Sequence, residues 1–483
     1  MTFRILTAAT LLAVSTVATA ATAFGLPDLG DVSQATFTPL IERRLGDRIM
    51  RDIRSHPQFF EDAEAVDYVN ALGDRLVARS ADTRQKFDFF LIRDNQINAF
   101  ALPGGYSGLN TGLLLAAQSE SEVASVVAHE IAHVTQRHIA RMVAQQDGSQ
   151  LLSLAALAVA ILASRTNGDA ASAAMAFGTA GTVQSQLNFT RENEREADRV
   201  GLQILESAGF DVRGMPSFFE RLQRATRLLE GSAPSYLRTH PLTFERLADV
   251  QNRVESTPYR QVPDTLDFQL VRAKLKATLD PLRDARAFFD ESLKERKFLS
   301  ETASRYGLTR TLLRAKDYPG ARREYATLQK TAPPNAMIAL LGCEIEFAAG
   351  GAAPAAACYR EAGVRFPYHR ALLYAQLDLM LEERQAEDAL KIIEDRLRFN
   401  SEDRQLYLRQ SRAYAQLGRM AAQHRALAEA YFRQGNLTGA VEQLQIASRS
   451  RDGDFYEMSA IEARLREVRR MDAEDRKEQK GGR

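Results

Sequence analysis

The stretch His129-Glu130-Ile131-Ala132-His133 decides how the chain is interpreted. On a helix the two imidazoles lie on one face and can reach a single Zn2+, while the glutamate points to the open coordination position, where a general base is needed. Apolar residues recur at intervals of three and four from 119 to about 146, so we expect one helix over that range. The alternative is a pair of core or surface histidines on an amphipathic helix.

A catalytic zinc needs a third protein ligand and leaves its fourth position to water. The next predicted helix, residues 190–208, offers four acidic candidates, Glu192, Glu194, Glu196 and Asp198. Glu194 and Asp198 share one helical face, so one of them can bind the metal while the other contacts substrate or a histidine ligand. Spacing alone does not choose between these two and Glu196.

Length and charge limit the class of protein. The chain has 483 residues, too many for one ordinary hydrophobic core, so we expect two or more domains. The net charge of +1 gives no electrostatic basis for binding nucleic acid, and we expect no nucleic-acid partner. With 45% apolar and 26% charged residues, the composition excludes a disordered chain and gives no sign of a polytopic membrane protein.

The N-terminal residues 1–23 have the pattern of a cleavable signal peptide. Arg4 precedes an apolar run over residues 5–18, and a small-residue cleavage site follows at Ala18-Thr19-Ala20 or Ala21-Thr22-Ala23. The alternative is a membrane anchor, but the run is shorter than the roughly 20 residues that span a bilayer. Export would allow Cys343 and Cys358 to form a disulfide, and two free thiols in a helical core are the alternative.

Residues 24–257 are predicted to form the catalytic domain. Helices are expected at 37–80, where there are two, and at 214–229 and 242–256. Between them, 87–94 and 97–112 are typical of strands, with a turn at Gly104-Gly105. We interpret Asn98, Ala99, Phe100 and Ala101 as a strand edge that binds extended peptide, and an ordinary hairpin is the alternative.

The C-terminal half repeats. After a predicted linker at 258–268, Ala321, Ala355 and Ala389 recur every 34 residues, the period of the tetratricopeptide helix pair. We therefore expect a tetratricopeptide-like domain over 269–470, with a generic helical bundle as the alternative. The charged stretch 462–483 is expected to be a solvated helix that frays into a disordered tail over 471–483. The fold class is mainly α: an α+β zincin-like protease domain with a small β-sheet, followed by an all-α tetratricopeptide-repeat solenoid.

Two uncharged stretches separate the two halves of the candidate metal site. Residues 148–164 are close to the lower limit for a membrane span, and residues 170–190 are more polar. Because the ligands on either side must bind one metal, the region crosses a membrane twice or not at all. We expect a helical hairpin that contacts the membrane surface or a client, with a double span as the alternative.

The motif at 129–133, followed by Glu194-Arg195-Glu196-Ala197-Asp198, resembles the zinc endopeptidases related to CAAX proteases, which include the heat-shock protease HtpX. The signal peptide, the segment NAFALPGG at 98–105, Arg238-Thr239-His240-Pro241 and the repeats narrow the resemblance. Together they are similar to the periplasmic members of this family that act in β-barrel assembly.

The resemblance implies residue roles. His129, His133 and Glu194 would hold one Zn2+ per chain, with Glu130 as the general base. Asp198 would be the second catalytic acidic group, either a proton donor or a residue that orients a ligand histidine. His240 would take the fourth zinc position and keep the protease latent, and a histidine that only caps or packs in a loop is the alternative.

The resemblance also implies a function. It describes a zinc endopeptidase of the Gram-negative periplasm, with or without added chaperone-like activity, that degrades misfolded or stalled outer-membrane proteins. Its partners would be unfolded or misassembled polypeptides and, through the repeats, the β-barrel assembly machinery, with peripheral membrane contact as a further expectation. The alternatives are a non-proteolytic or permanently latched periplasmic chaperone or scaffold and, less favoured because of the repeats, a secreted digestive protease.

Overall fold

The computed structural model of the chain describes residues 37–80, 85–145, 190–228 and 235–481. The predicted signal peptide and the uncharged stretches 148–164 and 170–189 lie outside the described residues. Within the described ranges, no helix combines the length and the hydrophobicity that crossing a bilayer requires.

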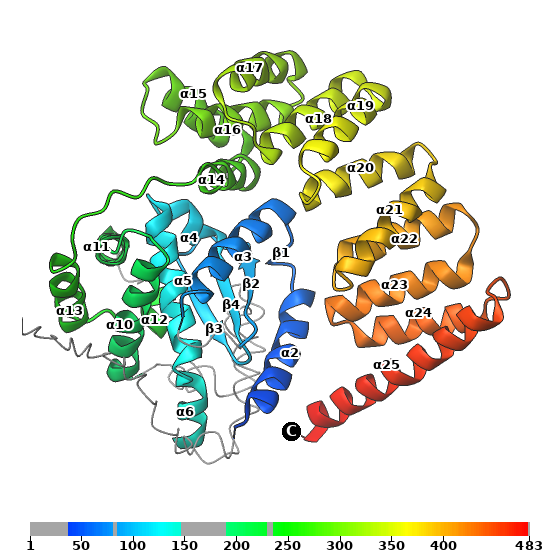
Figure 1. Cartoon of the computed structure of the whole chain (residues 1–483), viewed down its shortest axis with the longest axis horizontal. Helices are drawn as coiled ribbons and strands as arrows, with labels where there is room; N and C mark the ends of the chain where they lie inside the picture. Colours follow the sequence, from blue (N-terminus) through cyan, green and yellow to red (C-terminus); the bar gives the residue numbers. More distant parts are fainter. Residues whose placement is uncertain (1–36, 81–84, 146–189, 229–234, 482–483) are drawn as a thin grey trace, which may run out of the picture.

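A small sheet with helices on both faces forms the N-terminal part, and an array of helices curves around it (Figure 1). The strands are β1 (Phe59–Phe60), β2 (Asp88–Ile92), β3 (Ala99–Leu102) and β4 (Tyr106–Asn110). The helices of the N-terminal part are α2 (Pro39–Ser55), α3 (Ala63–Val77), α4 (Thr111–Ala116), α5 (Glu120–Thr135), α6 (His138–Gln145), α10 (Arg191–Ser207), α11 (Gly214–Leu228), α12 (Ser235–Thr239) and α13 (Phe244–Glu255).

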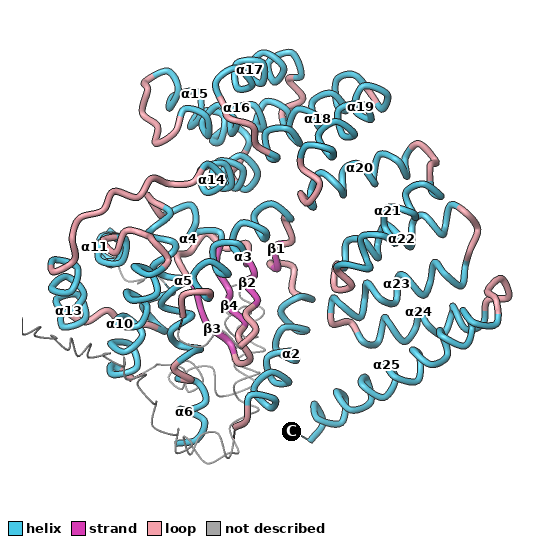
Figure 2. The backbone as a smooth tube through the Cα atoms, viewed as in Figure 1, coloured by secondary structure: helices cyan, strands magenta, loops and turns pink. Residues whose placement is uncertain are grey.

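The C-terminal part, residues 266–481, is helical where the structure describes it, and Figure 2 shows strands only in the N-terminal part. Its helices are α14 (Leu266–Leu279), α15 (Leu282–Lys294), α16 (Glu301–Arg314), α17 (Tyr318–Thr331), α18 (Ala336–Gly350), α19 (Ala352–Arg365), α20 (Arg370–Glu382), α21 (Ala386–Phe399), α22 (Arg404–Gln416), α23 (Met420–Gln434), α24 (Leu437–Arg449) and α25 (Phe455–Gly481). The small mixed sheet and the long helical region confirm the predicted fold class.

The sheet has the order β1-β2-β4-β3, with β2 and β4 parallel and the other neighbours antiparallel. Side chains along β2 alternate between two cores because successive residues of a strand point to opposite faces. Phe89 and Leu91 join the core that contains α3 and α5, whereas Phe90 and Ile92 join the core that contains α2. Both faces are therefore buried, and β3 lies at the edge of the sheet.

The sequence predicts one helix over 119–146, and that prediction is wrong at its centre. Helix α5 ends at Thr135, and α6 begins at His138 in a new direction. Arg137 between them has a left-handed backbone with φ of 53°, a conformation that commonly ends a helix. The Arg137 Nη2 group donates a hydrogen bond of 2.8 Å to the Phe37 carbonyl oxygen and so anchors the turn.

The alanines of the 34-residue period lie at equivalent places. Ala321, Ala355 and Ala389 are fully buried near the starts of α17, α19 and α21, the second helix of three successive helix pairs. A methyl group at this position allows the paired helices to approach closely, which is why the period is visible in the sequence.

A loop over residues 256–265 joins the two parts, so residues 266–268 of the predicted linker already belong to α14. The two parts nevertheless share one core. Helix α14 packs against α3 and α4, and the Tyr68 and Phe268 rings lie 6.1 Å apart. The buried Lys274 ammonium contacts the Asp62 carboxylate at 2.6 Å and the Glu64 carboxylate at 2.5 Å. The C-terminal part is thus fixed against the sheet domain at its first helix.

The far end of the helical array returns to the N-terminal part. Helix α23 contacts α2, and Arg404 forms an ion pair of 2.7 Å with Glu61. The predicted disordered tail is wrong for residues 471–481, which continue α25. Met471 packs on the apolar cluster of α24 and α25, and Asp475 pairs with Arg51 of α2 at 2.5 Å. These contacts hold a segment whose charged composition predicts disorder.

Cys343 and Cys358 form a disulfide between α18 and α19, with their Cα atoms 5.4 Å apart. The bridge therefore joins the two helices of one repeat. Of the two alternatives that the sequence leaves open, the structure has the paired one.

Replacing both cysteines with serine is expected to lower the free energy of unfolding by about 3 kcal/mol, because the bridge closes a loop of 15 residues in the unfolded chain. Urea denaturation followed by circular dichroism would measure the change. Reduced wild-type protein is the matched control and should unfold with the double variant. Equal urea midpoints for the oxidised wild type and the double variant would contradict this expectation.

Candidate metal centre

Two helices bring the motif residues together. Ser119 caps α5 by accepting a hydrogen bond from the Glu122 backbone N–H, and α5 then runs through the core, with His129 and His133 almost completely buried. Helix α10 crosses it closely because Gly201 has no side chain. A Cβ atom at this position would lie only 3.2 Å from the His129 backbone nitrogen.

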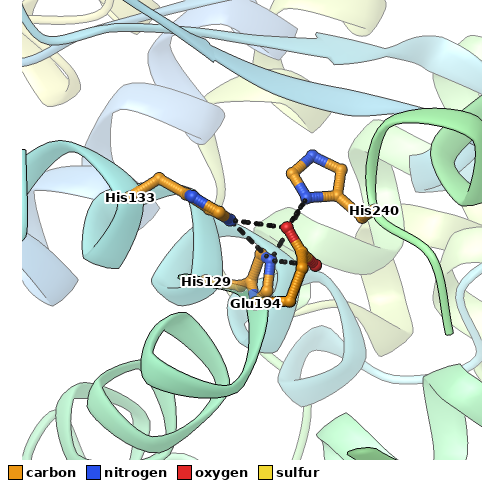
Figure 3. A group of neighbouring side chains, drawn as sticks. All are labelled: His129, His133, Glu194 and His240. Atoms are coloured by element: carbon orange, nitrogen blue, oxygen red, sulfur yellow. Dashed lines mark hydrogen bonds and ion pairs between the residues drawn. The ribbon is translucent and has the colours of Figure 1, made fainter. Parts of the chain in front are cut away.

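Four side chains converge on one point (Figure 3). His129 and His133 come from α5, Glu194 from the first turn of α10, and His240 from the residue after α12. Each offers one ligand atom, and these atoms lie within 4.8 Å of one another. All four residues are at most 2% exposed, so the group is shielded from water.

The spacing of the donors fits a tetrahedral metal ion. Four ligand atoms at the usual zinc distances of about 2.0–2.1 Å are separated from one another by about 3.3 Å. The His129 and His133 Nε2 atoms lie 3.0 Å apart, and Glu194 Oε1 lies 3.3 Å from His133 Nε2 and 3.0 Å from His240 Nδ1. His129 Nε2 lies 3.4 Å from His240 Nδ1. Nitrogen and carboxylate donors at these separations match zinc chemistry.

The next residue of the motif, Glu130, is fully buried beside this group. Its Oε1 atom lies 3.5 Å from His240 Nε2, on the side of the imidazole that faces away from Glu194. Burial raises the pKa of Glu130, and the nearby His240 and His129 rings oppose that shift. A carboxylate with a raised pKa next to a metal site is suited to take up and return a proton.

Asp198, one turn beyond Glu194, lies behind the donors. Its Oδ1 atom is 3.0 Å from His129 Nδ1, on the opposite side of the ring from Nε2, the nitrogen that faces the other donors. Arg246 of α13 donates two hydrogen bonds to Asp198, at 2.7 and 2.8 Å, and contacts Glu194 at 2.7 Å. Burial opposes ionisation of Asp198, but Arg246 and His129 together outweigh it and lower the pKa of this carboxyl group.

The same charges act on the ligands. Burial opposes protonation of His129, yet Asp198 and Glu194 outweigh it and raise the pKa of His129 to about 9. Burial opposes ionisation of Glu194 as well, but His240, Arg246 and the two motif histidines hold the pKa of this carboxyl group well below its usual range. Glu194 is therefore an anion that its positively charged neighbours stabilise.

The other acidic candidates of the predicted helix lie elsewhere. Glu192 is exposed, and Glu196 is partly exposed, pairing with His138 at 3.0 Å and Arg141 at 2.7 Å. The structure thus brings Glu194 into the donor group and leaves Glu196 outside it. Spacing could not make this choice, because it depends on the rotation of α10 against α5.

His240 follows a short helix that covers the site. The Tyr236 ring stacks on the His240 imidazole with centroids 4.6 Å apart, and Tyr236 itself is 2% exposed. The Tyr236 backbone N–H also donates a 3.3 Å hydrogen bond to the Ile97 carbonyl oxygen, immediately before the predicted substrate-binding edge. That edge is Asn98 followed by β3, and Asn98, Ala99, Phe100 and Ala101 are all at most 8% exposed.

Sequence reasoning missed three residues of the centre, Arg246, Tyr236 and His138. Each reaches the donors from another element, and none has a spacing that ties it to the motif. His138 is only five residues beyond His133, but on a continuous helix it would lie about 140° away around the axis. The helix break at Arg137 removes that separation.

Comparison with known proteins agrees with this geometry. Residues 64–254 match the model of Peptidase family M48. The beta-barrel assembly-enhancing protease of Escherichia coli is 32% identical over 96% of this chain and 96% of that protein. A Vibrio cholerae relative, whose name also describes β-barrel assembly enhancement, is 41% identical over 64% of each chain. The mitochondrial metalloendopeptidase OMA1 of Schizosaccharomyces pombe is 31% identical over 38% of this chain and 51% of that protein.

Arg246→Ala is expected to lower the free energy of unfolding of the metal-free protein by about 3–5 kcal/mol, because it leaves two buried carboxylates without their partner. The matched control is Arg253→Ala on the same helix, whose half-exposed ion pair with Asp249 contributes at most about 1 kcal/mol. Urea denaturation of both variants measures the difference. Similar losses in the two variants would contradict the role of Arg246.

Proposed function

The chain belongs to peptidase family M48, and from this premise we propose that it is a zinc-dependent endopeptidase of the Gram-negative periplasm that acts in the quality control of outer-membrane β-barrel proteins. Membership of this metallopeptidase family confirms the resemblance that the sequence indicates. The observation that carries the proposal is the buried donor set of His129, His133 and Glu194, with Glu130 beside it.

In the proposed mechanism His129, His133 and Glu194 hold the ion. A zinc ion bound there would lower the pKa of a bound water to about 7 and would polarise the scissile carbonyl group. The buried Glu130 carboxylate would act as the general base and then as the proton donor to the leaving amine. Asp198 orients His129 through Nδ1 and is itself fixed by Arg246; of the two roles that the sequence leaves open, this contact favours orientation over proton donation.

His240 is proposed to be a latch. Its Nδ1 atom lies 3.0 Å from Glu194 Oε1 and 3.4 Å from His129 Nε2, which are the separations expected of a fourth ligand. The reactive water would need the same position. A neutral imidazole in that place removes the nucleophile. Tyr236 stacks on His240, and its backbone N–H donates a hydrogen bond to the Ile97 carbonyl oxygen. The proposed latch therefore contacts the chain just before β3, where an extended substrate would pair.

Clients are proposed to be unfolded or misassembled polypeptides, and the helical array is proposed to receive them or the β-barrel assembly machinery. A cavity of about 670 Å³ lies between the array and the N-terminal part and contains none of the four donor residues. Residues of α2, α3, β2, α22 and α23 line it, so both parts contribute to its wall. The expected membrane contact concerns residues outside the described ranges and stays a prediction.

The second candidate function is a permanently latched chaperone or scaffold, favoured by the completeness of the four-donor set in this structure. Glu130→Gln separates the two functions, since it removes the base and leaves the three ligands in place.

Glu130→Gln is expected to retain one zinc ion per chain and to lower casein cleavage by about 10²–10⁴-fold. Zinc content by atomic emission and cleavage of fluorescent casein are the two measurements. Wild-type protein treated with a chelator is the control for metal dependence. A scaffold would keep its cellular phenotype in the Glu130→Gln variant, and that result would favour the second function.

His240→Ala is expected to raise casein cleavage severalfold over wild type, because water can enter the fourth position. The control is Arg238→Ala, an exposed residue of the same short segment, which should leave the rate unchanged. If His240→Ala cleaves casein no faster than wild type, His240 is not a latch. That result would not contradict the proposed zinc site.

A further inference from the structure

The Nδ1 atoms of the two motif histidines, which face away from the other donors, contact different kinds of side chain. The Nδ1 atom of His129 contacts a carboxylate, since Asp198 Oδ1 lies 3.0 Å from it. For His133 the Nδ1 atom instead contacts another imidazole, with His138 Nδ1 at 2.8 Å. His138 is fully buried, and nothing in the mechanism above uses it.

The hydrogen-bond chain allows one consistent set of protons. If His133 Nε2 faces the metal, its proton is on Nδ1 and is donated to His138 Nδ1. His138 then carries its own proton on Nε2, which donates to Glu196 Oε2 at 3.0 Å. Arg141 donates to the same oxygen at 2.7 Å and keeps this carboxylate in place. Each donor in the chain therefore meets an acceptor.

A neutral imidazole has an advantage over a carboxylate at this position. Glu130, Glu194 and Asp198 are already buried around the donors, and another carboxylate against His133 would add a fourth buried negative charge. The relay through His138 places the charge on Glu196, whose side chain is 39% exposed and paired with Arg141. His138 Nδ1 therefore gives the His133 Nδ1–H group a hydrogen-bond acceptor without adding a buried negative charge.

The turn at Arg137 brings the His138 ring next to His133. Residue 138 would point away from His133 if α5 continued, and the left-handed Arg137 turns the chain so that the two rings meet edge to face at 4.8 Å. Arg137 is held by its bond to the Phe37 carbonyl oxygen.

We propose that His138 is a positioning residue that fixes the tautomer and orientation of the metal ligand His133 and transmits its hydrogen bond to Glu196. The inference rests on the proposed zinc site. It adds an outer support that the motif itself does not contain.

The test compares two side chains of equal size in the full-length chain. In His138→Asn the amide oxygen takes the place of the Nδ1 acceptor, whereas His138→Leu has no acceptor. Zinc affinity is measured by competition with a chromophoric chelator, and the visible spectrum of the Co2+-loaded protein reports ligand geometry. We expect His138→Leu to weaken zinc binding by about 10–100-fold, with an altered Co2+ spectrum, and His138→Asn to stay within a few-fold of wild type.

Two results would overturn the inference: zinc binding by His138→Leu as tight as by wild type, or equal losses in the Leu and Asn variants. If His138→Leu gives no cooperative thermal unfolding, Glu196→Ala decides, with Glu206→Ala as the exposed control on the same helix. Weaker zinc binding for Glu196→Ala alone supports the relay, and equal affinities reject it. Wild-type protein that binds no zinc would instead reject the proposed function, and the inference with it.

Discussion

The pairing of Arg246 with Glu194 and Asp198 is the interaction on which the site depends. Removing an ion from water costs several kcal/mol even after the protein relaxes, so buried carboxylates persist only with compensating charge. Arg246 supplies one positive charge to two of them, and Glu130 lies buried nearby. The remaining negative charge is what a divalent cation held by His129, His133 and Glu194 would balance. A divalent cation at the donor group would therefore add to the compensation that Arg246 and a protonated His129 provide.

A second constraint ties the helical array to the catalytic domain. Lys274 from α14 is buried between Asp62 and Glu64 at the start of α3, and α3 packs against the ligand helix α5. At the other end Arg51 of α2 pairs with Asp475 of α25. The array is thus attached at both ends and lines an open cavity together with the N-terminal part, which is unlike a docking module joined by a free linker. A partner bound there would contact both parts of the chain.

Much of this could be predicted from the sequence because the signals are local. The i and i+4 spacing of His129 and His133 already specifies a shared helical face, and the 34-residue recurrence of alanine specifies paired helices. The signals failed where a distant contact overrides local preference. The charged segment 471–481 is helical because Met471 and Asp475 have partners on other helices. The helix expected over 119–146 breaks because Arg137 is anchored to Phe37.

Local sequence patterns were enough to predict the residue types of a metal centre, a glutamate in the position of a general base, and a helical repeat array after it. Helical spacing left Glu194, Glu196 and Asp198 open as partners of the histidines, and the family resemblance pointed to Glu194 and His240. The contacts of Arg246, Tyr236 and His138 became visible only in the folded chain. This difference arises because a motif contains residues that are neighbours within one or two turns of a helix. The environment of a buried charge is made by segments far apart in the chain, and their relative position is set by the packing of the whole core.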